Sequence, residues 1–259
     1  AYEDDNLAVS GNSADAFLRS LSTSAEIEQY ISAEDDRPAI IGFFDLAANK
    51  QDFEAFEQLA EKDSEHYRFG YTFSKEVLEE KHYSGCTVLV YPVSRFVDSQ
   101  YDKTRVRYPF KKISHVASLE TFVHQKALPL VGEMTLQNEQ LYRNIGLPVV
   151  TVFARINHAD KASEQAFQGL LKRVRAVAVK FKTLKFNVAD AKAYLRDMDQ
   201  KFGFEKVYTQ EPISVGLREG SIYYAMPQKE FSEELMEQFV LDFLDGKLEG
   251  IKQYEDDSD

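Results

Sequence analysis

The only thiol in the chain belongs to Cys86, and a single cysteine limits the sulfur chemistry available here. A dithiol redox centre needs a second cysteine to resolve a mixed disulfide, and one cysteine permits no internal disulfide. Two interpretations remain: a thiol that forms mixed disulfides or senses redox state, and a small apolar residue that begins a buried strand. The run Thr87 to Val90 is mostly apolar and mostly β-branched, which favours the buried strand.

The five histidines do not follow a spacing typical of a metal site. They are not spaced i, i+4 from one another, and they form no Cys/His cluster. The residues are His66, His82, His115, His124 and His158. We therefore expect no metal ligands and no cofactor, and we expect His158 to be a loop histidine with satisfied hydrogen bonds. The short acidic runs YEDDN and QYEDDSD lack the fixed oxygen cage of a specific calcium site.

A predicted helix over residues 161–182 is rich in basic residues, although the chain as a whole is acidic. Lys172, Arg173 and Arg175 are the candidate partner-binding residues, because they could form a positive patch for an acidic segment of another protein. The alternative interpretation is a solvated helix face, which is what most charged stretches are.

The composition excludes some classes of function. The formal net charge of −12 argues against nucleic-acid partners, which require clustered basic residues. No run of eighteen apolar residues occurs, so we expect no membrane span. A length of 259 residues favours two compact domains over one.

The order of predicted elements repeats once, because the chain restarts near residue 130 after Pro129. In the first half we expect helices from Thr23 or Ser24 and over 51–62, 75–83 and 114–126, and strands over 38–44, 67–73, 86–92 and 104–110. In the second half we expect helices over 134–144, 161–182, 191–202 and 231–247, a strand over each of 147–156 and 183–190, and a hairpin over 212–226. This order predicts an α/β fold with two mixed sheets flanked by helices.

Several stretches resemble one family. They are YRFGYTFSKEVLE, VHQKALPLVGEMT, RVRAVAVKF and FVLDFLDGKLEG. Together with the element order they are similar to the paired inactive thioredoxin-like domains, b and b′, of the protein disulfide isomerase family. The large endoplasmic-reticulum member with three active domains is similar, and so is the glycoprotein-dedicated member. The resemblance covers about residues 23–250.

The resemblance implies a location in the endoplasmic-reticulum lumen, chaperone-like protein binding and flanking redox domains, so we expect an excised segment of a longer isomerase. It also implies that Pro212 is the cis-proline of this fold and shapes a peptide-contact edge, against the alternative of an ordinary trans proline. An active member would carry a cysteine pair after the central strand. Here the corresponding stretches read DLAANKQDF and NHADKASEQAF, so no cysteine chemistry carries over.

We accordingly predict a polar N-terminal arm (1–22), domain b (23–129), domain b′ (130–250) and an acidic tail (251–259). The predicted function is a non-catalytic spacer and binding region of a monomeric isomerase. Its partners would be unfolded or glycoprotein clients and a lectin chaperone or other co-chaperone. The alternatives are a free-standing redox-inactive luminal chaperone and an acidic calcium-buffering protein. A thiol enzyme that uses Cys86 would require that side chain to be exposed.

Overall fold

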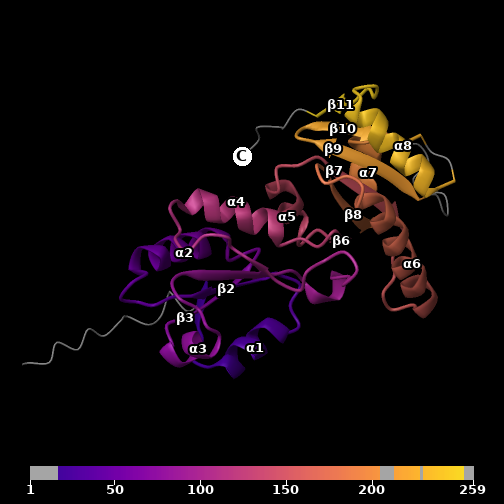
Figure 1. Cartoon of the computed structure of the whole chain (residues 1–259). Coiled ribbons are helices and arrows are strands. Elements are labelled where there is room, and N and C mark those ends of the chain that lie inside the picture. Colours follow the sequence, from indigo (N-terminus) through magenta and orange to yellow (C-terminus); the bar gives the residue numbers. More distant parts are fainter. Residues whose placement is uncertain (1–16, 205–212, 228–229, 254–259) are drawn as a thin grey trace, which may run out of the picture. The chain divides into compact units, whose positions relative to one another are not determined.

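The computed structural model describes residues 17–204, 213–227 and 230–253, and these divide into two compact units (Figure 1). Unit 1 runs to Val93 and resumes at Arg105–Ala127, whereas unit 2 contains Ser94–Thr104 and the chain from Leu128. The expected division was a single boundary between residues 129 and 130. The structure differs because the loop segment Ser94–Thr104 belongs to unit 2.

Unit 1 contains a five-stranded mixed sheet in the order β1-β3-β2-β4-β5. Its strands are β1 (Leu18–Ser20), β2 (Ala39–Phe43), β3 (Arg68–Thr72), β4 (Thr87–Tyr91) and β5 (Val106–Arg107). Strand β3 pairs in parallel with β1 and β2, while β4 is antiparallel to both β2 and β5. Strand β2 is buried along its whole length, as expected for an apolar run in the centre of a covered sheet.

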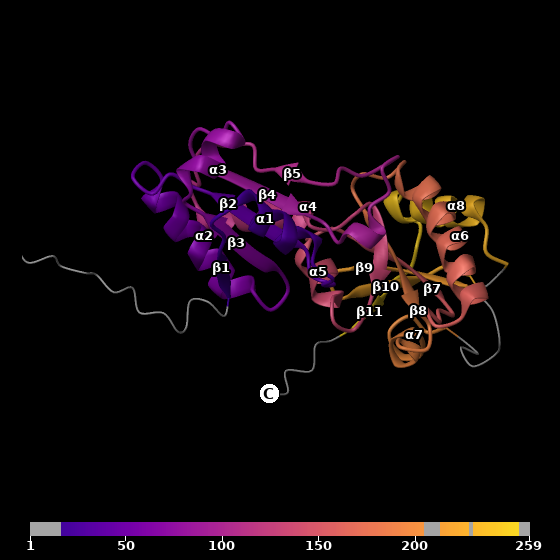
Figure 2. The same ribbon diagram turned by 90° about the horizontal axis from the view of Figure 1, so that it is seen from below.

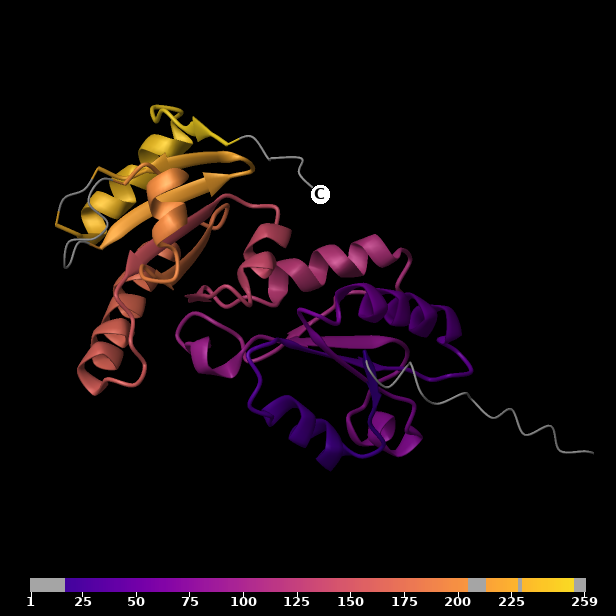
Figure 3. The same cartoon turned by 180° about the vertical axis from the view of Figure 1, so that it is seen from behind.

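Helices cover both faces of this sheet. They are α1 (Ser24–Ser32), α2 (Lys50–Asp63), α3 (Lys75–Glu80) and α4 (Val116–Lys126). Helices α2 and α4 lie together on one face, and α1 and α3 lie on the other, as the front and back views agree (Figure 3). The core under α1 and α3 contains Ile27, Ile41, Val77 and Leu89.

Unit 2 repeats this plan with a six-stranded sheet in the order β11-β10-β9-β7-β8-β6. Its strands are β6 (Val131–Met134), β7 (Val149–Ala154), β8 (Lys185–Asp190), β9 (Ser214–Glu219), β10 (Ile222–Ala225) and β11 (Ile251–Lys252). Strand β8 is parallel to β6 and β7, and β9 is antiparallel to β7 and β10. The expected hairpin is confirmed, and Gly220 turns it with a φ of +59° that glycine adopts without strain.

The helices of unit 2 also form two layers. They are α5 (Glu139–Asn144), α6 (Lys161–Ala178), α7 (Leu195–Gln200) and α8 (Glu233–Leu244). Helices α6 and α8 pack together on one face of the sheet, and α7 lies on the opposite face (Figure 2). The short 3₁₀ helix η2 (Ser94–Phe96) contacts β6 in the same unit. None of the helices in the described ranges is both long and apolar enough to span a membrane.

Side-chain caps fix where several helices begin. Thr23 accepts a hydrogen bond from the backbone N–H of Glu26, and Asp160 accepts one from Ser163. Ser232 caps α8 in the same way. Each cap satisfies a backbone donor that has no partner within its helix. Of the two expected caps for α1, Thr23 and Ser24, the structure has Thr23, and the helix begins at Ser24.

Three short strands were missed. Strand β1 lies inside the stretch expected to be a polar arm, where Leu18 and Leu21 are nevertheless buried. Strand β6 occupies the stretch that Pro129 and Gly132 suggested to be a hinge. Gly132 is needed there because a Cβ atom would lie 2.8 Å from the Tyr142 hydroxyl. Strand β11 lies in the predicted tail and pairs with β10.

Candidate functional site

The Cys86 side chain is buried at the start of β4, with 1% of its surface exposed. Burial, and to a lesser extent the Asp52 carboxylate, raise the pKa of its thiol to about 12 against the opposing charge of Arg107. A thiol with so high a pKa is almost entirely un-ionised at pH 7, and the thiolate is the reactive form. The expectation of an unreactive core thiol is confirmed by this burial.

We expect the native chain to resist thiol labelling. At pH 7 a chromogenic disulfide reagent should modify Cys86 only as fast as the protein opens, and denatured protein should react at once. The chain alone should not reduce insulin, and Cys86→Ser should leave any thiol–disulfide exchange at background. Rapid labelling of native protein, or turnover that Cys86→Ser abolishes, would contradict this expectation.

The stretch after β7, where the resemblance would place a cysteine pair in an active member, carries a histidine network. The His158 Nδ1 lies 2.5 Å from a carboxylate oxygen of Glu164, and Nε2 lies 2.9 Å from one of Glu133. Glu133 lies on β6 with only 8% of its side chain exposed. The ring of Phe167 packs edge-on against the imidazole. His158 is therefore satisfied, as expected, but by two carboxylates that the sequence did not point to.

The pKa of His158 lies above its ordinary value of 6.5. The hydrogen bond to Glu164 is the largest cause, burial opposes it, and the hydrogen bond to Glu133 and both carboxylate charges add to it. A raised pKa in the folded state means that the protonated ring stabilises the fold below pH 6.5, and that this stabilisation is lost as the pH rises through the folded value.

The free-energy difference between the native chain and His158→Gln should therefore be larger at pH 6 than at pH 9. Urea unfolding of both proteins at the two pH values measures it. The matched control is His115→Gln, because His115 is exposed and no carboxylate contacts its ring among the described residues. A constant difference across this range, or a larger one at pH 9, would show that the His158 charge does not stabilise the fold.

The three basic candidates on α6 do not form one exposed patch. Lys172 faces solvent. Arg173 is paired with Glu233 of α8 at 2.6 Å and lies 4.6 Å over the Phe231 ring. Arg175 has only 7% of its side chain exposed. The i, i+2 relation of Arg173 and Arg175 turns them to different sides of the helix.

Arg175 has a structural role within unit 2. Its guanidinium donates a hydrogen bond of 3.1 Å to the Phe96 carbonyl and lies 3.4 Å from the Asp98 carboxylate. Both partners belong to the segment Ser94–Thr104. The same segment accepts a hydrogen bond from the Leu130 backbone N–H through Asp102. Arg175 thus holds the segment against α6. The other candidate, Pro212, lies outside the described residues, so its cis geometry stays a prediction.

Unit 2 has a small pocket between α5 and α7, over the sheet. Its volume is about 40 Å³. The wall is formed mainly by apolar and aromatic side chains, and charged side chains stand among them. The lining residues are Met134, Glu139, Tyr142, Arg143, Val149, Thr151, Phe153, Tyr194, Asp197, Phe202, Arg218 and Tyr223. The buried Tyr194 hydroxyl has no hydrogen-bond partner among the described residues. The pocket therefore combines an apolar wall with an unused polar group.

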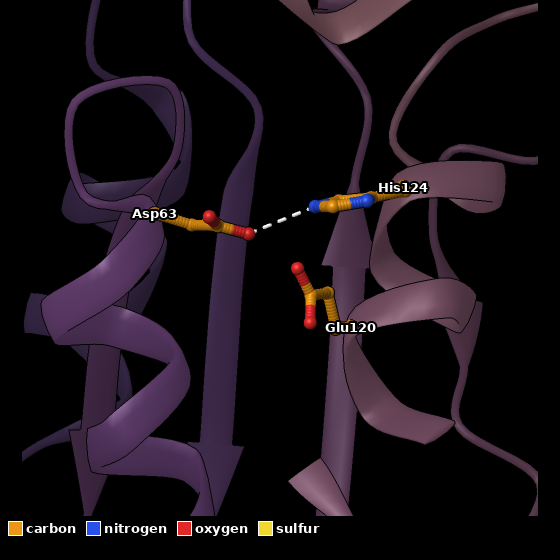
Figure 4. A group of neighbouring side chains, drawn as sticks. All are labelled: Asp63, Glu120 and His124. Atoms are coloured by element: carbon orange, nitrogen blue, oxygen red, sulfur yellow. Dashed lines mark hydrogen bonds and ion pairs between the residues drawn. The ribbon is translucent and has the colours of Figure 1, made fainter. Parts of the chain in front are cut away.

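Unit 1 brings a carboxylate pair and a histidine together where α2 meets α4 (Figure 4). Asp63 ends α2, and Glu120 and His124 lie one turn apart on α4. The His124 Nε2 lies 2.8 Å from an Asp63 oxygen, and Lys62 pairs with Glu120. The spacing of histidines from one another and from the cysteine does not reveal this group in the sequence, because it contains only one histidine and no cysteine. The i, i+4 spacing of Glu120 and His124 is the signal that could have found it.

Tyr67 lies next to this group. Its ring stacks on the His124 ring with centroids 5.9 Å apart and an interplanar angle of 12°. Its hydroxyl is buried without a partner among the described residues. Burial raises the pKa of Tyr67, and the charges of Asp63 and Glu120 raise it further. The Tyr67 side chain therefore packs against this group from the His124 side.

Comparison with known proteins places this geometry in a family. A family described as thioredoxin-like domain matches residues 44–242. Protein disulfide-isomerase A3 of Gallus gallus is 26% identical over 234 residues, which are 88% of this chain and 44% of that protein. Protein disulfide-isomerase A4 of Homo sapiens is 25% identical over 232 residues, 88% of this chain and 34% of that protein. The chain thus spans less than half the length of these relatives.

A solved structure shares the fold of both units. The crystal structure of the bb fragment of ERp72 matches with a TM-score of 0.71 and 22% identity, covering 90% of this chain and 99% of that one. The structural likeness and the family match both agree with the two mixed sheets flanked by helices that this chain forms. The chain belongs to the thioredoxin-like domain family and is homologous to members of the protein disulfide isomerase family.

Proposed function

We propose that this chain is a non-catalytic protein-binding and spacer region of a protein disulfide isomerase in the endoplasmic-reticulum lumen, where it supports oxidative protein folding. The observation that carries this proposal is the pocket between α5 and α7, in a thioredoxin-like unit without a cysteine. Binding without thiol chemistry is the function that such a site can perform. The proposed partners are unfolded or glycoprotein clients, and the chain acts as a monomer.

The size of the pocket limits what it can hold. A volume of about 40 Å³ exceeds the roughly 10–15 Å³ that one water needs, but it is far below the ~150 Å³ of an apolar cavity that binds benzene. An aromatic side chain therefore does not fit without rearrangement. The tip of a short aliphatic side chain, such as valine or leucine, is the proposed occupant.

The lining also offers polar groups that suit a peptide backbone. Glu139 and Asp197 provide two carboxylates, and Arg143 and Arg218 provide two guanidinium groups. Burial lowers the pKa of Arg218, and the Arg143 charge lowers it further. Charges of both signs can bond the N–H and C=O groups of an extended client. They do not favour a client of one charge.

An acidic co-chaperone segment, such as the arm of a lectin chaperone, is a second proposed partner at Lys172 and Arg173. The exposed ammonium of Lys172 supports it. Arg173 supports it less, because its guanidinium already has the Glu233 carboxylate as partner. Binding at this place would be electrostatic and would weaken as salt screens exposed charges.

The test compares two identical chemical changes. Thr151→Ile replaces the hydroxyl in the pocket with an ethyl group, whereas Thr183→Ile makes the same change in an exposed turn. A labelled aliphatic peptide titrated against the full chain should bind at least about tenfold more weakly to Thr151→Ile, as expected when the site of an anchor residue is filled. Thr183→Ile should bind it like the native chain. Equal affinities for all three proteins would refute binding at this pocket.

The acidic partner is tested separately, with an acidic peptide at low and high salt. Lys172→Glu should reduce its affinity by a few-fold at low salt, since one exposed pair contributes ~1 kcal/mol or less. The aliphatic peptide should be unaffected by this change and by salt. If neither peptide binds any of these proteins, the region acts only as a spacer.

A further inference from the structure

We propose that Asp63, Glu120 and His124 form a site for one divalent transition-metal ion of the zinc type in unit 1, and that the Tyr67 hydroxyl faces its remaining coordination position. Their ligand atoms all lie within 4.8 Å of one another. Zinc bonds of about 2.0–2.1 Å in a tetrahedron hold ligand atoms roughly 3.4 Å apart. The hydrogen-bonded pair at 2.8 Å must therefore separate by about half an ångström, which side-chain rotation allows.

The position of the three ligands on rigid elements supports the site. Glu120 and His124 are one turn apart on α4, so both side chains leave the same face of that helix. Asp63 reaches the same space from the last residue of α2, and the two helices pack together within unit 1. Figure 4 shows the Glu120 carboxylate lying beside the space between Asp63 and His124. An ion there would bridge the two helices.

The buried side chain of Tyr67 supports the site independently of the three ligands. Its side chain is 1% exposed and its hydroxyl has no partner among the described residues. An unpaired buried hydroxyl is unfavourable, and such groups usually face a water or a ligand. The Tyr67 ring lies parallel to the ring of His124, with the two centroids 5.9 Å apart. The unused hydroxyl thus belongs to a side chain that packs directly against one of the three ligands.

The donor types select the class of ion. Calcium and magnesium prefer six or more oxygen ligands, whereas an imidazole nitrogen with carboxylate oxygens suits zinc and its neighbours in the transition series. Two carboxylates with a neutral imidazole also balance the charge of a divalent ion. The Asp63 and His124 side chains are mostly buried and Glu120 is partly exposed, so the ion would reach the site past Glu120.

Lys62 should oppose metal binding at this site. Its ammonium pairs with Glu120 from the solvent side and therefore competes with a metal ion for the same carboxylate. Removing this ammonium should strengthen metal binding. A purely structural role for the cluster makes no such prediction, because the loss of an ion pair would then change stability alone.

The experiment measures Zn²⁺ binding to the full chain by isothermal titration calorimetry, with Co²⁺ absorption as a report on coordination. The native chain should show one tight site above the weak binding of its acidic ends. Glu120→Gln should weaken it by at least about tenfold, the scale seen when groups that hold a metal are removed. Tyr67→Phe should weaken it several-fold, and Lys62→Met should tighten it several-fold. His115→Gln, an exposed histidine outside the cluster, should change nothing.

Two results would overturn the proposal. One is equal zinc affinity for the native chain and Glu120→Gln when circular dichroism shows that both are folded. The other is a bound-Co²⁺ spectrum without the intense visible bands of a four-coordinate ion. The inference does not rest on the proposed peptide binding, which lies in unit 2. Glu120→Gln should leave the affinity for the aliphatic peptide unchanged.

Discussion

Arg175→Glu should destabilise unit 2 by about 3–5 kcal/mol, the cost of breaking a buried pair and leaving a charge without compensation. The new carboxylate would lie beside the Phe96 carbonyl and the Asp98 carboxylate, in the place of the guanidinium that bonds both. All three groups would then repel one another in a site of low exposure. Denaturant unfolding followed by circular dichroism should show this loss of stability as a transition at a lower denaturant concentration.

Lys172→Glu is the matched control, because it makes a similar change of charge on the same helix at an exposed position. It should shift stability by no more than about 0.5 kcal/mol. Arg173→Glu should fall between the two, since its pair with Glu233 is partly exposed. If Arg175→Glu lowers the free energy of unfolding by less than about 1 kcal/mol, the buried contacts of Arg175 do not hold the segment Ser94–Thr104 in place. A triple reversal of these residues would confuse lost folding with lost binding.

Asp52→Ala should destabilise unit 1 by about 2–4 kcal/mol, because it leaves buried donors without their charged acceptor. Asp52 is buried on α2, and its carboxylate accepts a hydrogen bond of 2.6 Å from the Ile113 backbone N–H. Its second oxygen accepts one of 3.1 Å from the Asn49 side chain. The bond to Ile113 joins α2 to the chain that leads into α4, so its loss loosens both.

Asp52→Asn keeps an oxygen acceptor and should cost less than Asp52→Ala. Glu54→Ala, an exposed change on the same helix, should cost about 0.5 kcal/mol or less. Denaturant midpoints of the three variants give the comparison. Equal midpoints for Asp52→Ala and Glu54→Ala would show that the buried carboxylate is not needed to order this part of unit 1.

The pattern of apolar residues predicted the long elements well for a physical reason. Helix α6 buries one face, so its apolar residues follow the helical period, whereas strands β2 and β7 are buried on both faces and therefore appear as continuous apolar runs. Short edge strands carry a weaker pattern. Strand β6 contains only four residues, and Pro129 and Gly132 beside and within it are also typical of a hinge.

The clustering of side chains from distant elements could not be predicted from local spacing. Arg175 is buried because Phe96 and Asp98 cover it, and those residues stand 79 and 77 positions earlier in the chain. His158 meets Glu133 across 25 residues for the same reason. Composition showed that unit 2 has no thiol, but the pocket between α5 and α7 depends on how the helices pack on the sheet.

The most direct test of the account is to map, by nuclear magnetic resonance, where an aliphatic peptide binds the full chain. We predict that the backbone amide signals that shift come from the pocket lining, including Met134, Tyr142, Val149 and Tyr223, and that Thr151→Ile removes these shifts. Shifts confined to unit 1, or the same pocket shifts in Thr151→Ile, would contradict the claim that this chain binds clients at the pocket between α5 and α7.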